Sequence, residues 1–181
     1  MGARWMTPFS TQIIQSETGF ILMDGKGRKH RLPNSILTEA YDVPYEGISI
    51  NVLENSNLIV NFGSAWYFHF QSFDQGLSYQ LVLEQNSKTD ELVVLNYLIA
   101  SGHAFLQSVD FKLKRTAQTV KFAYNPQMKL IAVFVDEEPE PLAHYDYDTQ
   151  GNLITAVDQN AQTRSYEYNA GKNQHQNHVQ V

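Results

Sequence analysis

Four tyrosines recur at shortening intervals along this sequence, and each one closes a triplet that begins with an apolar or aromatic residue. They are Tyr97, Tyr124, Tyr147 and Tyr168, separated by 27, 23 and 21 residues. The stretch between two such tyrosines is long enough for two strands and two turns. A single hairpin cannot bury its own apolar face, so units of this kind must lie side by side in a longer sheet.

The hydrophobic pattern around these tyrosines has a period of two. In residues 164–168, Arg164, Tyr166 and Tyr168 fall on one face of a strand, and residues 66–70 alternate in the same way. The turn-rich segments between such runs are too short for parallel crossovers. We therefore predict an all-β fold, a curved antiparallel sheet of successive hairpins with about a dozen strands, and one short helical turn near residues 34–40.

Composition narrows the functional classes. The chain has 181 residues, a formal net charge of -6 and no cysteine. The acidic balance gives a nucleic-acid partner no electrostatic support, and the fold cannot depend on disulfides or a cysteine-ligated zinc ion. The longest apolar runs are shorter than a membrane span, and the N-terminus has no apolar core of a signal peptide. We expect no nucleic acid, no membrane span and no cofactor.

Residues 145–153, Tyr-Asp-Tyr-Asp-Thr-Gln-Gly-Asn-Leu, followed by Val157 and Asp158, resemble the YD repeat of Rhs proteins, which are large bacterial polymorphic toxins. Residues 2–8, 19–28 and 139–147 resemble segments of the early Rhs core, in the same order. The resemblance implies N-terminal hairpins over 1–78, YD-repeat hairpins over 79–171 and a disordered polar tail over 172–181. The implied repeat-structural residues are Tyr97, Tyr124, Tyr145, Tyr147, Asp148, Gly151, Asn152, Asp158, Tyr166 and Tyr168.

The resemblance also implies a role. YD repeats of Rhs proteins form an open β-sheet shell around a C-terminal toxin, and many Rhs proteins leave the cell by type VI secretion, which needs no signal peptide. By this resemblance the chain is a non-enzymatic shell segment, in the bacterial cytoplasm before export. Its partners are the remainder of the shell and its toxin, or components of the secretion apparatus. Open sheet edges recruit further strands, so we also expect a homo-oligomer.

One position departs from the family's repeat. The second turn of the repeat has glycine where this chain has Ala161. Alanine is strained at positive φ whereas glycine is not. We therefore expect Asn160 to take the left-handed position instead, which would shift the turn type.

A compact binding module is the alternative function. Trp66 and Tyr67 lie in the aromatic run 66–70, and exposed aromatic rings can stack on sugar rings or on a partner protein. Tyr145 and Tyr166 could serve in the same way. The competing interpretation is that these rings line the packed face of the sheet.

Carboxylates and histidines offer weaker candidates. The acidic segment 136–140 could bind calcium, but its prolines restrict wrapping around an ion, and a solvated loop explains it. Asp146, Asp148 and Asp158 invite comparison with the paired acids of glycosidases, yet Asp148 and Asp158 each begin a turn, where aspartate bonds nearby backbone N–H groups. His175 and His178 have a metal-ligand spacing inside the polar tail. We predict no catalytic residues, no metal site and no enzyme activity.

Overall fold

The computed structural model describes residues 8–169 and 172–180. These residues form sixteen β-strands and three short 3-10 helices. Consecutive strands, with the exception of β3 and β4, are neighbours in an open antiparallel sheet, which confirms the predicted all-β fold of successive hairpins. No helix among the described residues is long and apolar enough to cross a membrane. The chain divides into two compact units, Trp5–Ala117 and Gln118–Val181, which are described in turn.

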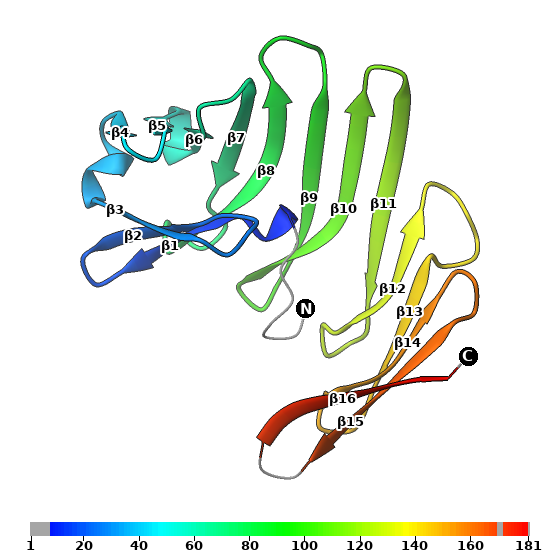
Figure 1. Cartoon of the computed structure of the whole chain (residues 1–181). Coiled ribbons are helices and arrows are strands. Elements are labelled where there is room, and N and C mark those ends of the chain that lie inside the picture. The colour runs from blue at the N-terminus through cyan, green and yellow to red at the C-terminus, as the bar shows by residue number, and fades with distance from the viewer. Residues whose placement is uncertain (1–7, 170–171, 181) are drawn as a thin grey trace. The chain divides into compact units, whose positions relative to one another are not determined.

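The larger unit is a meander with a branch. From one side to the other its strands follow the order β10-β9-β8-β7-β6-β5-β4, and β1 pairs with both β8 and β2, to which β3 is added (Figure 1). The strands are β1 (Gln12–Ser16), β2 (Gly19–Met23), β3 (Lys29–Leu32), β4 (Tyr41–Val43), β5 (Ile48–Val52), β6 (Leu58–Asn61), β7 (Trp66–Gln71), β8 (Ser78–Asn86), β9 (Leu92–Ala100) and β10 (His103–Leu113). The 3-10 helices are η1 (Pro8–Ser10), η2 (Asn34–Leu37) and η3 (Glu54–Ser56).

The core of the larger unit follows from the period of two. Ile48 and Ile50 of β5 are buried while the residues between and after them are not, and the register places Ile50 opposite the buried Val60 of β6. Because directly opposed side chains point to the same face, each strand adds its alternate residues to one core.

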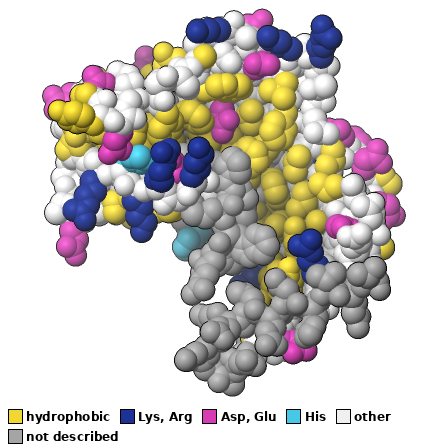
Figure 2. All heavy atoms as spheres, in the orientation of Figure 1, with side chains coloured by type: hydrophobic (Ala, Val, Ile, Leu, Met, Phe, Trp, Pro, Cys, Tyr) yellow, Lys and Arg dark blue, Asp and Glu magenta, His cyan; other side chains and the backbone are white. Residues whose placement is uncertain are grey.

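Both branches of the larger unit contribute to this core. Ile13 of β1 lies opposite Tyr79 of β8, and Phe20 of β2 packs edge-on against the Tyr79 ring with 6.1 Å between ring centroids. Ile36, from the short η2 helix that follows Pro33, is fully buried as well. In the view of Figure 2, further hydrophobic side chains lie exposed over the region of β8–β10.

The division between the units differs from the expected one. A boundary at residue 78 would fall at the first residue of β8, a strand that pairs with β7 along one edge and with β1 and β9 along the other. Strand β8 therefore lies inside the larger compact unit, which ends at Ala117. The expected division into N-terminal hairpins and YD-repeat hairpins stays a prediction.

The smaller unit is a plain meander in the order β16-β15-β14-β13-β12-β11. Its strands are β11 (Thr116–Tyr124), which begins two residues before the boundary, β12 (Leu130–Val135), β13 (Ala143–Tyr147), β14 (Leu153–Asp158), β15 (Thr163–Asn169) and β16 (Lys172–Gln180). Where we expect a disordered tail, β16 pairs with β15 from Thr163 opposite Gln180 to Tyr168 opposite His175. Its polar composition, which suggested disorder, is also common in strands at a sheet edge.

Burial separates the two units sharply. Among the described residues of the smaller unit, Ala132 is the one apolar side chain classed as buried, while the larger unit holds all the others. The other apolar and aromatic side chains described in β11–β15 are half-buried or exposed. The smaller unit therefore depends on backbone pairing and local contacts more than on a core.

Candidate functional site, a repeated tyrosine and its turns

Four hairpin turns of this chain have the same construction. Each begins with Asp or Asn, whose side-chain Oδ1 accepts the backbone N–H of the residues two and four positions later, at 2.8–3.0 Å. The backbone carbonyl of the same residue accepts the N–H three positions later. The four starting residues are Asp24, Asn125, Asp148 and Asp158. One side chain thus satisfies two N–H groups of a tight turn.

The fourth residue of each turn has positive φ. Gly27 and Gly151 have φ of 81° and 83°, and Met128 and Ala161 have φ of 59° and 60°. Our expectation that Asn160 would replace Ala161 in the left-handed position is wrong. The two bonds from Asp158 hold the turn frame on both sides of Ala161, so alanine accepts the strained conformation, and the turn type does not shift.

The electrostatics of these turns favour the charged carboxylate. Hydrogen bonds from the Asn152 side chain and backbone hold the pKa of Asp148 below its usual value, and the Gln150 and Gly151 backbones add to this. The Asn152 Nδ2 donates to Asp148 Oδ2 at 2.9 Å. Asp148, Gly151 and Asn152 therefore act together as a turn, which leaves the Asp148 carboxylate occupied.

Asp24 forms the same kind of turn in a more buried place. Burial by itself raises the pKa of Asp24, but hydrogen bonds from the Arg28 side chain and from the Arg28 and Lys26 backbones outweigh it, so the pKa is lowered. Arg28 Nε donates to Asp24 Oδ2 at 2.6 Å. A glycine at the fourth position, Gly27, avoids the strain that Ala161 bears.

Three of the four repeated tyrosines occupy equivalent places in a hairpin. Each lies opposite a leucine of the following strand, and the next pair in the register skips one residue of that strand, which is a β-bulge. The pairs are Tyr97 with Leu106, Tyr124 with Leu130, and Tyr147 with Leu153. Tyr168 differs, because it lies opposite His175 and the irregularity falls after it, before Asn169.

Hydroxyl groups of the same tyrosines reach back to the preceding strand. The Tyr97 hydroxyl donates to the Leu81 carbonyl, and the Tyr147 hydroxyl donates to the Leu130 carbonyl, both at 2.8 Å. Tyr168 has a hydrogen bond with the backbone of Leu153. Leu130 and Leu153 therefore each lie between two tyrosines: one opposes the leucine in the hairpin, and the tyrosine of the next unit bonds to its backbone.

The tyrosine rings of the smaller unit are partly desolvated as a group. Burial raises the pKa of Tyr124 to about 12, and the neighbouring Tyr147 contributes. Burial also raises the pKa of Tyr145, Tyr147 and Tyr168, each with a contribution from a nearby tyrosine. Each shift has burial as its largest cause and a neighbouring tyrosine as a further one, so these tyrosines of β11, β13 and β15 are partly withdrawn from water and lie near one another.

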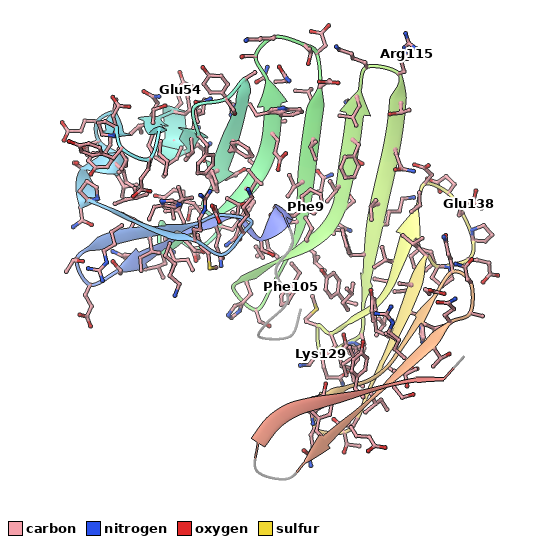
Figure 3. The ribbon with its side chains drawn as sticks, viewed as in Figure 1. Phe9, Glu54, Phe105, Arg115, Lys129 and Glu138 are labelled. Atoms are coloured by element: carbon pink, nitrogen blue, oxygen red, sulfur yellow. The ribbon has the colours of Figure 1, made fainter. Side chains whose placement is uncertain are left out.

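Neighbouring turns in the smaller unit also touch. Lys129, in the turn between β11 and β12 (Figure 3), places its Nζ 6.0 Å from the centroid of the Tyr147 ring. A Cβ added to Gly151 would meet Lys129 Cε at 3.2 Å. Glycine at this position therefore serves both the positive φ and the close approach of the next turn.

Trp66 and Tyr67 do not form one stacking surface. They are adjacent in β7, so they point to opposite faces of the sheet. Trp66 lies opposite Asn86 of β8 and is half-buried, while Tyr67 is 37% exposed. Tyr145 and Tyr166, in contrast, lie with the half-buried tyrosines of the smaller unit.

The carboxylates and histidines that sequence analysis singled out lie in separate parts of the sheet. No group of three or more metal-ligating side chains occurs among the described residues. Asp136 Oδ1 accepts the Thr119 backbone N–H at 2.7 Å, and Asp146 pairs with the exposed His144 at 3.1 Å. His175 and His178 lie in β16, whose backbone pairs with β15.

The leucines of the repeat are the residues that sequence reasoning missed. Leu130 and Leu153 each follow their tyrosine by six positions, a spacing that is visible in the sequence and that would have identified them. No protein-family model matches this chain, and no curated protein matches it.

Proposed function

We propose that this chain is a non-enzymatic structural segment of an Rhs-type shell that encloses and delivers a C-terminal toxin, by type VI secretion or a related export route. The observation that carries the proposal is the interlocking of successive units through Leu130 and Leu153. Each of these leucines completes its own hairpin and also provides the backbone group to which the next tyrosine bonds.

An interlocked array of this kind suits a wall. Each hairpin contacts its neighbours in the sheet, so stability is a sum of units and of interfaces between adjacent units, as in repeat proteins. The smaller unit buries little of its apolar surface. Further hairpins placed beside it would bury more of that surface, and a shell of many such hairpins would be more stable than this unit alone. The carboxylates of Asp148 and Asp158 hold the backbone of their turns, which supports a structural role for these two residues.

Partners and location follow from the same proposal. The binding partners are the remainder of the shell and its toxin, or components of the secretion apparatus. The chain stays in the bacterial cytoplasm until export by a route that needs no signal peptide. The reading frame after codon 181 tests this part directly: further repeats followed by a toxin domain support the proposal, and an unrelated domain contradicts it.

The repeat itself is tested by duplication. A second copy of residues 148–168, inserted after Tyr168, adds 21 residues that begin with a turn and end with a tyrosine. We expect the longer protein to gain β-signal in far-UV circular dichroism and to unfold no more easily than the parent. A matched insertion with the same composition in scrambled order should add no strand. Equal behaviour of the two insertions would contradict the proposal.

Self-association gives a second readout. The outer strands of an open sheet offer unpaired backbone groups, so we expect sedimentation velocity to show assemblies that grow with concentration. Hydrogen exchange should show that β16 amides become more protected as assembly proceeds. A compact monomer at every concentration, with no binding of a hydrophobic dye, would count against a wall segment.

A further inference from the structure

Strand β8 divides one of its edges between two partners. Residues Ser78 and Gln80 lie opposite Ile14 and Gln12 of β1, whereas Leu83, further along β8, lies opposite Val94 of β9. Two ladders cannot occupy the same stretch of an edge, so the far end of the β9–β10 hairpin diverges from β8. The Tyr97 hydroxyl bonds to the Leu81 carbonyl where the two ladders separate.

A pocket of about 330 Å³ lies in this fork. Its floor is the face of β1 and β8 that carries Gln12, Ser78 and Gln80. Phe73, from the loop before β8, and His103, at the start of β10, form its walls. Figure 3 labels Phe105, two residues beyond His103 near this end of β10. The volume is at the lower end of the ~300–1,000 Å³ range of small-molecule sites.

Asp74 is the one acidic side chain among the described residues that line the pocket, and both of its carboxylate oxygens already accept hydrogen bonds. Asp74 Oδ1 accepts the Ser78 N–H and the Ser72 hydroxyl, and Asp74 Oδ2 accepts the Ser78 hydroxyl at 2.6 Å. Among the described residues that line the pocket, none is Lys or Arg. An anionic ligand would therefore find no lysine or arginine counter-ion there, and the three hydrogen bonds to Asp74 compete with a cation for its carboxylate.

Three side chains keep hydrogen-bonding capacity for a ligand. His103 Nδ1 donates to the Ser101 carbonyl, so Nε2 of the neutral ring is an acceptor. The Gln80 Nε2 donates to Ser78 Oγ, which leaves Gln80 Oε1 and one N–H available. The Gln12 amide has no hydrogen-bond partner within the part of the chain that the structure describes.

The wall beside these groups is aromatic. The Phe73 ring lines the pocket and is supported from behind by Tyr97, with 5.6 Å between ring centroids. A flat apolar ring next to paired donors and acceptors matches a pyranose, which has an apolar C–H face and hydroxyls at its rim. We propose that this pocket binds a neutral sugar ring, as one residue of a glycan.

Saturation-transfer difference NMR on the full chain tests the proposal with four probes: the methyl glycosides of glucose, galactose, mannose and N-acetylglucosamine. We expect transfer to the ring protons of at least one probe, with a millimolar dissociation constant. Gln80→Ala and Phe73→Ala should each weaken binding by about tenfold, the equivalent of one lost hydrogen bond or ring contact. Gln85→Ala, an exposed glutamine on the same strand, is the matched control and should bind normally.

Several results would overturn the proposal: no transfer with any of the four probes, unchanged binding in both Gln80→Ala and Phe73→Ala, or equal loss in Gln85→Ala. Far-UV circular dichroism reports whether Phe73→Ala folds, and if it does not, Gln80→Ala decides alone. Failure here leaves the proposed shell role intact, because the duplication of residues 148–168 does not involve this pocket.

Discussion

In the larger unit, alternate side chains of two branches meet in a core that buries Ile13, Leu22, Phe70 and Leu81 completely. In the smaller unit the strands are just as regular, yet Ala132 alone among its described apolar residues is buried. The smaller unit has instead a set of repeated local hydrogen bonds: those of the turns begun by Asp or Asn, and those of the tyrosine hydroxyls with the preceding strand. One series of β-hairpins can thus be stabilised by a buried core over part of its length and by repeated local hydrogen bonds over the rest.

The largest expected effect separates the two modes of stabilisation. Phe70→Ala should lower the free energy of unfolding of the larger unit by about 3–5 kcal/mol, because the ring is fully buried. Phe122→Ala, in the half-buried face of β11, should lose only about half of the ~1.5–3 kcal/mol that full burial of a side chain gives. Urea titration followed by hydrogen exchange of each unit measures both. Equal losses would remove the distinction between the units.

A smaller effect on stability is expected at the fourth position of the repeated turns. Replacing glycine by alanine there should destabilise the protein, and replacing alanine by glycine should stabilise it. Gly151→Ala should destabilise by about 1–2 kcal/mol, because φ is positive at this position. Ala161→Gly should stabilise by about 1 kcal/mol through relief of strain, partly offset by the freedom of glycine in the unfolded chain. Thermal unfolding midpoints are the measurement. A destabilised Ala161→Gly would show that the left-handed conformation of residue 161 carries no strain.

Each tyrosine hydroxyl that bonds to the preceding strand should contribute about 1 kcal/mol to the free energy of unfolding. Tyr147→Phe removes the bond to the Leu130 carbonyl while it keeps the ring, so we expect a loss of about 0.5–1.5 kcal/mol. Tyr145→Phe, on the same strand and face, is the control and should change stability less. Chemical denaturation measures the free energy of unfolding of both variants. Equal values would mean that the hydrogen bond from Tyr147 to the Leu130 carbonyl does not stabilise the fold.

The smallest expected effect is on the loss of stability at low pH. The pKa of Asp148 is lowered in the folded protein, so this turn contributes stability that is present above about pH 4, the ordinary range of an aspartate, and is lost as the pH falls through the folded value. Asp148→Asn should keep the turn, since Asn125 forms the same one, and should weaken the acid dependence. Unfolding curves of both proteins from pH 7 to pH 3 test this. An unchanged acid limb would assign the dependence to Asp24 or Asp74, whose pKa values are also lowered.

Local pattern was enough to predict the hairpins, because alternation and turn residues act within a few positions. The branch at β8 could not be read in this way, since Gln12 and Gln80 meet only when burial of Ile13 against the core selects that pairing. The turn at Ala161 was misread for a related reason. Residue preference alone favours Asn160 in the left-handed position, whereas two backbone N–H groups that donate to the Asp158 carboxylate hold the turn with Ala161 there. The polar composition of residues 172–180 suggested disorder because polar residues are seldom buried. Backbone pairing with β15 does not require burial, so composition gave no sign of it.

The hydrogen bonds between these tyrosines and the leucine backbones all run toward the N-terminus of the chain. Tyr147 donates to Leu130 and Tyr168 bonds to Leu153, so each tyrosine bonds to a strand made earlier in the chain. During synthesis, which runs from the N-terminus, the backbone groups of Leu130 and Leu153 are made before the tyrosines that bond to them. In the smaller unit these bonds can therefore form in the order of synthesis, without a segment from later in the chain.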